Sequence, residues 1–388
     1  MTSPAYDVIV AGLGAMGSAT AWQLARRGLR VLGLDRWHPP HAMGSSTGET
    51  RIIREAYFES PFYVPMVRRA YHLWTALEVA TGEKLLTRTG GLSVGPRDGP
   101  LVSGAIASAQ AHGVPFEVLD AASIRDRFPF QPHDDLTGVW DPGAGVLRPE
   151  ECIRTLLSQA GHFGATLRYD EPVLRWEATP DQVVVTTGSG CYTAARLVLT
   201  SGAWLGQLQG GAQVPLTVAR QIMLWLTARR PERFAPERCP IWLWETGEGP
   251  VYYGFPDMGT GPKVAQHHGG QVVDPDTVNR EVDDREADGI LRFLAGAVPD
   301  LTRPVRQAKV CLYSNTPDEH FILDRHPAHP SVVVASPCSG HGFKFAPTVG
   351  EILADLVLDQ SPSFDLTPFR LDRFGTSRSP ILADGGEG

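Results

Sequence analysis

The sequence predicts an α/β protein, α+β overall, in which a βαβ unit is combined with a second domain built on a mostly antiparallel sheet. Two observations favour this fold class. Residues 6–35 alternate strand, glycine-rich turn, helix and strand, whereas residues 86–144 and 219–309 are rich in Pro, Gly and aromatic residues with short strand-like runs. A chain of 388 residues also exceeds the usual size of one hydrophobic core, so we expect two domains.

The N-terminal unit has the pattern of a Rossmann-like dinucleotide-binding fingerprint. In "GLGAMG", Gly12 permits a tight turn, Gly14 lets the backbone approach a pyrophosphate, and Gly17 lets helix and strand pack closely. Asp35 ends the second strand, eighteen residues after Gly17, where it is placed to accept hydrogen bonds from a ribose. Such a turn can be merely structural, and residues 6–35 alone do not distinguish FAD from NAD.

Farther along the chain, β-branched runs around Gly188-Ser189-Gly190 predict a hairpin in residues 181–204. The second run ends near Gly202 and Trp204, where glycine allows a ligand to approach the backbone. The runs "QIMLWLT", "IWLWET" and "VYYGF" predict further strands. We therefore assign the first domain to residues 1–85, 145–218 and 310–375, the interleaved second domain to 86–144 and 219–309, and a flexible tail to 376–388.

Several basic residues stand out near glycines and aromatic residues. Arg51 and Arg54 are three residues apart, which would place them on one helical face; a solvated face is the usual alternative to an anion site. Lys263 follows a glycine-rich loop, and a desolvated lysine there could act on an anionic species, although surface lysines are commoner. Residues 332–358 repeat the strand, glycine turn and helix pattern, and Lys344 near the helix start indicates an anionic partner.

Composition excludes other classes. A formal net charge of −8 argues against a nucleic-acid surface. The five cysteines contain no C-x-x-C pair, so we expect neither disulfides nor a metal site, and a reducing compartment. Because no stretch approaches the roughly 20 apolar residues of a membrane span and no leader is recognisable, we expect a cytoplasmic protein with no membrane partner.

Six motifs together carry a resemblance to a known family: "GLGAMGSATAWQLARRG", "TRIIREAY", "YYGFP", "DPDTVNRE", "CLYSNTPDEHFILD" and "SGHGFKF". In this order, over roughly residues 5–372, the chain resembles the monomeric sarcosine oxidase and N-methyltryptophan oxidase family of flavoenzymes. The resemblance implies an FAD domain and a substrate domain joined by crossings of the chain. It also implies a covalent bond from the Cys311 sulfur to the flavin, with Tyr313 near the active site.

The resemblance assigns further roles residue by residue. Arg54 and Lys344 match the pair that binds the substrate carboxylate, Tyr253 and His267 match residues beside the bound amine, and Lys263 with Arg51 match basic residues where oxygen is reduced. Tyr313, Gly340 and Thr47 are expected at the substrate. The expected FAD contacts are Gly12, Gly14, Met16, Gly17, Asp35, Arg36, Ser45, Ser46, Val173, Gly202, Trp204, Cys311, Gly340, Gly342, Phe343 and Lys344.

Three departures from the family pattern concern the cavity wall: Thr47 in place of histidine, Cys338 in place of phenylalanine, and a shorter loop from Tyr253 to Lys263. These departures bear on which substrate is bound more than on which reaction is catalysed. We predict a monomeric FAD-dependent oxidase of secondary amino acids such as sarcosine, in which a hydride equivalent passes to covalent FAD, the imine hydrolyses and O₂ is reduced to hydrogen peroxide. The alternatives are an oxidase of cyclic imino acids such as proline or pipecolate, an NAD-dependent dehydrogenase, and a non-catalytic flavin-binding module.

Overall fold

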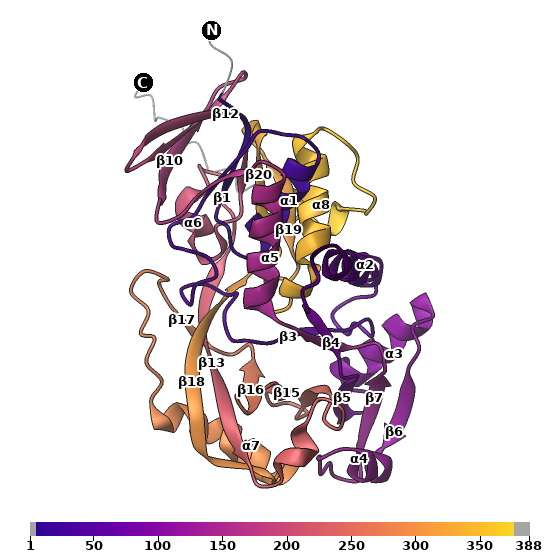
Figure 1. Cartoon of the computed structure of the whole chain (residues 1–388). Helices are drawn as coiled ribbons and strands as arrows, with labels where there is room; N and C mark the ends of the chain where they lie inside the picture. Colours follow the sequence, from indigo (N-terminus) through magenta and orange to yellow (C-terminus); the bar gives the residue numbers. More distant parts are fainter. Residues whose placement is uncertain (1–4, 376–388) are drawn as a thin grey trace, which may run out of the picture.

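A computed structural model describes residues 5–375 of the chain, and two large sheets organise it (Figure 1). The first sheet has a parallel centre in the order β9-β2-β1-β12-β20, to which β19 and the hairpin β10–β11 add antiparallel strands. Its strands are β1 (Tyr6–Ala11), β2 (Val31–Leu34), β9 (Thr166–Arg168), β10 (Val173–Ala178), β11 (Val183–Thr187), β12 (Gly190–Leu199), β19 (Ile322–His326) and β20 (His329–Ser336).

Helices cover this first sheet because their apolar faces pack together and against it. The helix α1 packs between α5 and α8, and α2 packs beside α8 (Figure 1). The bounds are α1 (Ala15–Arg26), α2 (Tyr63–Thr81), α5 (Pro149–His162) and α8 (Ala346–Val357), with the short α6 (Leu205–Leu208) after β12. The strand–turn–helix units predicted at residues 6–35 and 332–358, and the hairpin in 181–204, are confirmed.

The second sheet is antiparallel except where β14 runs parallel to β5, in agreement with the predicted mostly antiparallel sheet. Its strands are β5 (Gly91–Pro96), β6 (Glu117–Asp120), β7 (Leu136–Asp141), β13 (Thr217–Ala228), β14 (Ile241–Glu245), β15 (Val251–Asp257), β16 (Pro262–His267), β17 (Gln271–Val272) and β18 (Leu301–Asn315). Three helices accompany it: α3 (Pro100–His112), α4 (Ala121–Arg127) and α7 (Asp288–Ala297).

A small third sheet joins the two larger ones and consists of β3 (Arg51–Ile53), β8 (Gly145–Leu147) and β4 (Leu86–Arg88). The predicted helical face of Arg51 and Arg54 is therefore wrong. Ile52 and Ile53 are β-branched and pair with Val146 and Gly145 of β8, so the segment is extended. The short 3₁₀ turns are η1 (Gly202–Trp204), η2 (Pro231–Phe234), η3 (Asp284–Ala287), η4 (Phe343–Phe345), η5 (Thr367–Phe369) and η6 (Leu371–Phe374).

Register in the second sheet decides which side chains share a face. Cα partners across antiparallel strands lie on one face, and side chains alternate with a period of two. Through the pairs Phe255–Lys263, Tyr253–Ala265, Met223–Ala265, Met223–Lys309 and Gln221–Cys311, this places Tyr253, Lys263, His267, Cys311 and Tyr313 on the same face. The opposite face carries Trp242, Trp244, Leu224 and Val264, which form a core with α7.

Three predictions concern the whole chain. The division into domains at residues 85, 144, 218, 309 and 375 stays a prediction, as does the monomeric state. The predicted tail at 376–388 lies outside the described residues. Among the helices of residues 5–375, none combines the length and the apolar character that crossing a membrane requires.

Candidate active site

A cavity of about 510 Å³ lies between the carboxyl ends of the first sheet's parallel strands and the shared face of the second sheet. This is the position at which open α/β sheets bind ligands. Of the predicted site residues, those that line the cavity are Gly12, Gly14, Met16, Asp35, Arg36, Ser45, Ser46, Arg51, Arg54, Val173, Gly202, Trp204, Tyr253, His267, Cys311, Tyr313, Gly340, Gly342, Phe343 and Lys344. Gly17, Thr47 and Lys263 do not line it.

The glycine turn after β1 explains why three glycines are needed there. Gly12 has φ +95°, and a Cβ atom on it would lie 2.7 Å from the carbonyl oxygen of Thr200. A Cβ on Gly17 would lie 1.7 Å from the Gly12 oxygen, so Gly17 serves the packing of helix on turn. At Gly14 the nearest atom to such a Cβ is Ser46 Oγ at 3.7 Å, so only a ligand would require glycine at that position.

Asp35 has a second task besides the one predicted. Its Oδ2 accepts a hydrogen bond from the Leu13 N–H at 2.6 Å, and Oδ1 accepts one from the Trp37 N–H at 2.9 Å. The carboxylate therefore fixes the glycine turn against the end of β2. Because each carboxylate oxygen has two lone pairs, acceptor capacity remains on the side that lines the cavity.

Arg36 and Trp204 both donate hydrogen bonds to Asp276, a residue to which the sequence assigned no role. Asp276 Oδ1 accepts from Arg36 Nη1 at 2.6 Å and from Trp204 Nε1 at 2.9 Å, and its Oδ2 accepts from Gln207 at 2.7 Å. Asp276 belongs to the segment between β17 and η3 and lines the cavity. This segment therefore contributes to the cavity lining through Asp276, which is held by Arg36, Trp204 and Gln207.

The loop before β3 is braced by two cations. Arg51 donates to the carbonyl oxygens of Ser45 at 2.6 Å and Thr50 at 2.7 Å, and to that of Thr47. Lys263, which is 1% exposed, donates to the carbonyl oxygens of Gly48 at 2.7 Å and Thr50 at 2.8 Å. Burial lowers the pKa of Lys263 well below its usual value, and the Arg51 charge adds to this effect.

Two buried cations face one carboxylate at the other end of the cavity. Arg54 Nη2 donates to both carboxylate oxygens of Glu59, at 2.8 and 2.7 Å, and Lys344 Nζ donates to the carbonyl oxygen of His341 at 2.6 Å. Burial alone would raise the pKa of Glu59, but the Arg54 charge, with His341 and Lys344, lowers it to about 2. Burial and the Arg54 charge lower the pKa of Lys344 to about 7.

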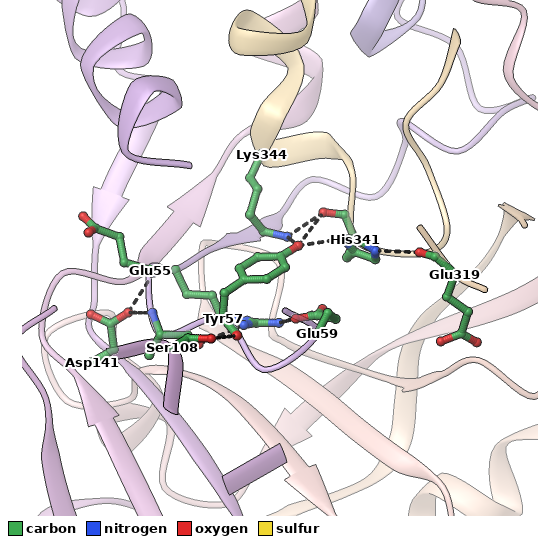
Figure 2. A network of polar contacts seen from close by, with 10 residues as sticks. Glu55, Tyr57, Glu59, Ser108, Asp141, Glu319, His341 and Lys344 are labelled. Atoms are coloured by element: carbon green, nitrogen blue, oxygen red, sulfur yellow. Dashed lines mark hydrogen bonds and ion pairs between the residues drawn. The ribbon is translucent and has the colours of Figure 1, made fainter. Parts of the chain in front are cut away.

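Behind these cations lies a buried pair of rings. The Tyr57 hydroxyl lies 2.6 Å from His341 Nδ1 and 3.3 Å from Lys344 Nζ, while His341 Nε2 lies 3.1 Å from the carbonyl oxygen of Glu319 (Figure 2). Burial lowers the pKa of His341 to about 3, so its imidazole is neutral. Within the described residues, His341 lines the cavity and Tyr57 does not.

An aromatic wall stands on the shared face of the second sheet. The Tyr313 hydroxyl lies 3.4 Å from that of Tyr253 and 3.5 Å from His267 Nδ1. Burial, with His268 adding, lowers the pKa of His267 well below its usual value, and burial raises the pKa of Tyr253 to about 12. Gly340 has φ +75° and a Cβ there would lie 2.5 Å from the Tyr313 ring, so glycine is required for this wall. All of these groups are uncharged at neutral pH.

Cys311 lies in the same face, two residues before Tyr313 on β18. Its side chain is 2% exposed and lines the cavity. Burial raises the pKa of the Cys311 thiol, although the Arg51 and Lys263 charges oppose this. The sulfur is thus a neutral group between the basic loop and the aromatic wall.

Comparisons with known proteins agree with this geometry. A model of the family described as FAD dependent oxidoreductase (DAO) matches residues 7–356. The chain belongs to the FAD-dependent oxidoreductase family. The predicted cofactor FAD is thereby confirmed, and the NAD-dependent dehydrogenase alternative is removed.

Individual proteins similar over nearly the whole chain confirm the predicted resemblance and enzyme class. Monomeric sarcosine oxidase from Streptomyces avermitilis is 47% identical, covering 92% of this chain and 94% of that protein. N-methyl-L-tryptophan oxidase from Salmonella arizonae is 37% identical, covering 95% of this chain and 99% of that protein. The open form of NikD, an amino acid oxidase of nikkomycin biosynthesis, superimposes with a TM-score of 0.83 at 28% identity over 94% of this chain and 97% of that one.

The residues present fit FAD. A Cβ at Gly202 would meet nothing within 4 Å, and one at Gly14 would meet only Ser46, so both leave backbone open to the cavity. The first turn of α1 offers free N–H groups to a pyrophosphate, and no acidic side chain lies in that turn. Asp35 keeps acceptor capacity for a ribose. The turn therefore offers donors and open backbone for the pyrophosphate, and Asp35 offers an acceptor for the ribose of a dinucleotide.

Glu59, Tyr57, His341 and Asp276 are functional candidates that sequence reasoning missed. A carboxylate five residues after Arg54 is a weak signal for Glu59, because acidic residues usually lie at the surface. Tyr57 and His341 are 284 positions apart, and no local pattern indicates that they meet. Asp276 lay within the quoted motif "DPDTVNRE" but had no assigned role.

Proposed function

We propose that this FAD-dependent oxidoreductase oxidises N-methyl amino acids such as sarcosine, with O₂ as electron acceptor and hydrogen peroxide as product. The observation that carries the proposal is the pair of buried cations, Arg54 and Lys344, which share the cavity with the uncharged aromatic wall of Tyr253, His267 and Tyr313. Such a cavity has one place for a carboxylate and another for an uncharged amine. The names of the two similar oxidases quoted above support the same substrate class.

Carboxylate binding follows from the donor geometry. A guanidinium offers two parallel N–H bonds and an ammonium adds a point charge, so together they fix the orientation of a planar carboxylate. Arg54 binds Glu59 through Nη2 and the Ala56 carbonyl oxygen through Nη1, so an incoming carboxylate would use the remaining N–H groups of the guanidinium or exchange with the ion pair. Lys344 contributes one N–H that no protein acceptor takes among the described residues.

The aromatic wall would hold the amine. His267, Tyr253 and Tyr313 are neutral at pH 7, and they offer lone pairs and hydroxyl groups without a charge that would compete for the carboxylate. Orientation of the amine-bearing carbon in such a dry cavity is what this wall contributes. Tyr313 is buried, and Tyr253 and His267 are half-buried, so a bound substrate would cover the remaining exposed surface of the wall.

FAD would be held by the glycine turn, Asp35, Arg36, Ser46, Gly202, Trp204 and the turn from Gly340 to Lys344. When bound, FAD supplies the redox chemistry, accepting a hydride equivalent from the amine and returning the electrons to O₂. Cys311 would be bonded to it through sulfur. Lys263 and Arg51 would stabilise negative charge that develops as O₂ is reduced.

A substrate panel tests the proposed activity. We expect hydrogen peroxide from sarcosine or N-methyl-L-tryptophan, and kcat/KM at least about tenfold lower for sarcosine amide, because one charge-assisted interaction is lost. L-Proline serves as the cyclic comparison. Equal rates with sarcosine and its amide, or no peroxide from any N-methyl amino acid, would refute the proposal.

The covalent bond is tested separately. Acid precipitation of the purified enzyme should leave yellow flavin in the pellet, and Cys311→Ala should release it to the supernatant. The matched control is Cys239→Ala, since Cys239 is equally buried but does not line the cavity. A colourless wild-type pellet would contradict the bond to Cys311.

A further inference from the structure

We propose that Tyr57 and His341 are positioning residues that hold the Lys344 ammonium beside Arg54, and so set how tightly a carboxylate binds. The inference rests on the proposed function, because it concerns the same carboxylate end of the cavity. It assigns a role to the Tyr57 ring, which contacts both cations, and to the His341 turn, which binds the Lys344 ammonium.

Tyr57 contacts both cations at once. Its ring centroid lies 4.3 Å from Arg54 Cζ and 5.1 Å from Lys344 Nζ, distances at which an aromatic face attracts a cation. The ring is fully buried, and Tyr63 and Phe345 pack against it at centroid distances of 5.1 and 5.5 Å. A rigid ring in contact with two like charges fixes their separation.

The hydrogen bonds around Tyr57 run in one direction (Figure 2). The carbonyl oxygen of Glu319 can only accept, so His341 Nε2 carries the proton and donates to it at 3.1 Å. The neutral His341 Nδ1 is then an acceptor, and the Tyr57 hydroxyl donates to it at 2.6 Å. The lone pairs of that hydroxyl remain for Lys344 Nζ at 3.3 Å.

Lys344 is left with one donor for a ligand. An ammonium has three N–H groups, and His341 supplies the acceptor for one through its carbonyl oxygen, at 2.6 Å. The Tyr57 hydroxyl takes a second, so the third is directed by these two bonds. Glu319 has φ +58°, and in this conformation its carbonyl oxygen accepts the hydrogen bond from His341 Nε2 that orients the imidazole.

Charge balance links this arrangement to protonation. The titratable groups that face Lys344 are Arg54, Tyr57 and Glu59 from the segment after β3 and His341 from the turn before η4. Arg54 and Glu59 neutralise one another, and His341 is neutral. A substrate carboxylate therefore needs the charge of Lys344, whose pKa of about 7 makes that charge sensitive to its hydrogen-bond acceptors.

The test is carboxylate binding by the holoenzyme as a function of pH. Acetate, which stays ionised throughout the neutral range, is titrated calorimetrically between pH 6 and 9 in two buffers of different ionisation enthalpy. For the wild type we expect affinity to fall as pH rises through the Lys344 pKa, with proton uptake on binding above it. Tyr57→Phe keeps the ring but removes the hydroxyl acceptor, so the midpoint should move to lower pH and the affinity at pH 7.5 should fall about tenfold.

Three comparison variants separate positioning from general damage. Tyr71→Phe removes another buried hydroxyl, which donates to the Gly143 carbonyl at 2.9 Å away from the cavity, and should leave the midpoint unchanged. His341→Asn offers an amide oxygen near the position of Nδ1, so it should retain more affinity than His341→Leu. The kcat of Tyr57→Phe at saturating sarcosine should stay within about threefold of the wild type, because a bound substrate is already oriented.

The outcomes distinguish this inference from the proposed function. An unchanged acetate midpoint and proton uptake in Tyr57→Phe, or an equal shift in Tyr71→Phe, would overturn the positioning role even if sarcosine is oxidised. If the wild-type holoenzyme oxidises no N-methyl amino acid but still shows the shift with acetate, the proposed substrate is wrong and the positioning role stands. If wild-type acetate binding is independent of pH, the role of Lys344 charge is refuted.

Discussion

Lys263 shows how a residue can act on a cavity that it does not line. Its ammonium donates to the carbonyl oxygens of Gly48 and Thr50 and lies 4.2 Å from the centroid of Phe255, which is itself in the cavity wall. These acceptors and the ring face favour the charged form, which opposes the effect of burial on its pKa. A cation held this way would act through electrostatics at short range.

Replacing Lys263 tests this at the residue scale. For Lys263→Met we expect reoxidation of reduced enzyme by O₂ to slow about 100-fold, since a preorganised charge near developing negative charge is lost. Anaerobic reduction by substrate should change little. Stopped-flow absorbance measures both half-reactions, and exposed Lys84→Met is the control. Equal losses in the two half-reactions would argue against an oxygen-side role.

At the scale of single elements, the turn from β1 to α1 separates folding from ligand binding. Gly17→Ala forces a Cβ to within 1.7 Å of the Gly12 oxygen, so we expect the apoprotein to lose several kcal/mol of stability. Gly14→Ala has room, with only Ser46 Oγ at 3.7 Å, so its apoprotein should melt near the wild-type temperature. Its FAD affinity should nevertheless fall at least about tenfold.

Differential scanning fluorimetry of apoprotein and titration with FAD measure the two quantities for each variant. If Gly14→Ala binds FAD as tightly as the wild type, the pyrophosphate does not approach that glycine. If Gly17→Ala melts at the wild-type temperature, the helix moves easily away from the turn.

Elements also show what the sequence could predict. The fingerprint unit, the hairpin around Gly188-Ser189-Gly190 and the strand–turn–helix at 332–358 follow from local periodicity and turn chemistry, and all three are present. The segment from Arg51 to Arg54 was wrongly predicted as helical, because the spacing of two arginines is a weak signal compared with strand pairing to β8. Pairing with β8 therefore determines the extended conformation of residues 51–53.

The candidate site divides in the same way. Most of the site residues expected from the resemblance line one cavity, since they sit in motifs tied to strand ends, and the roles assigned to them stay predictions. Thr47 is the exception that bears on specificity: it is buried, and its carbonyl oxygen accepts from Arg51, but it does not line the cavity. Glu59 and the Tyr57–His341 contact depend on residues brought together by the fold, which no local pattern contains.

For the whole molecule, buried neutral histidines predict how stability depends on pH. His341 has a folded pKa of about 3, and His267 also lies well below the usual 6.5 or so of an unfolded histidine. The unfolded chain then binds protons that the folded chain does not, so stability is lost as pH falls below about 6.5. Glu59, with its pKa of about 2, acts in the same direction below about 4.5.

We expect His341 alone to contribute a loss of about 2 kcal/mol between pH 7 and pH 5. Urea midpoints measured at the two pH values should therefore decrease at pH 5, and His341→Asn should show a smaller decrease. His133, which is exposed, provides the control variant His133→Asn. A midpoint that rises from pH 7 to pH 5 would contradict the neutral state of these buried histidines.

The long ladder between β13 and β18 extends from the second sheet toward the first (Figure 1), and it brings the Tyr313 ring against Gly340 in the turn after β20. A cofactor bound as proposed would be gripped at its phosphates by the first sheet and at its ring by the second. It would then connect the two large sheets, between which the chain passes several times. Because a cofactor in contact with both sheets would restrain their relative motion, access of small molecules would depend on side chains and short loops at the rim of the cavity.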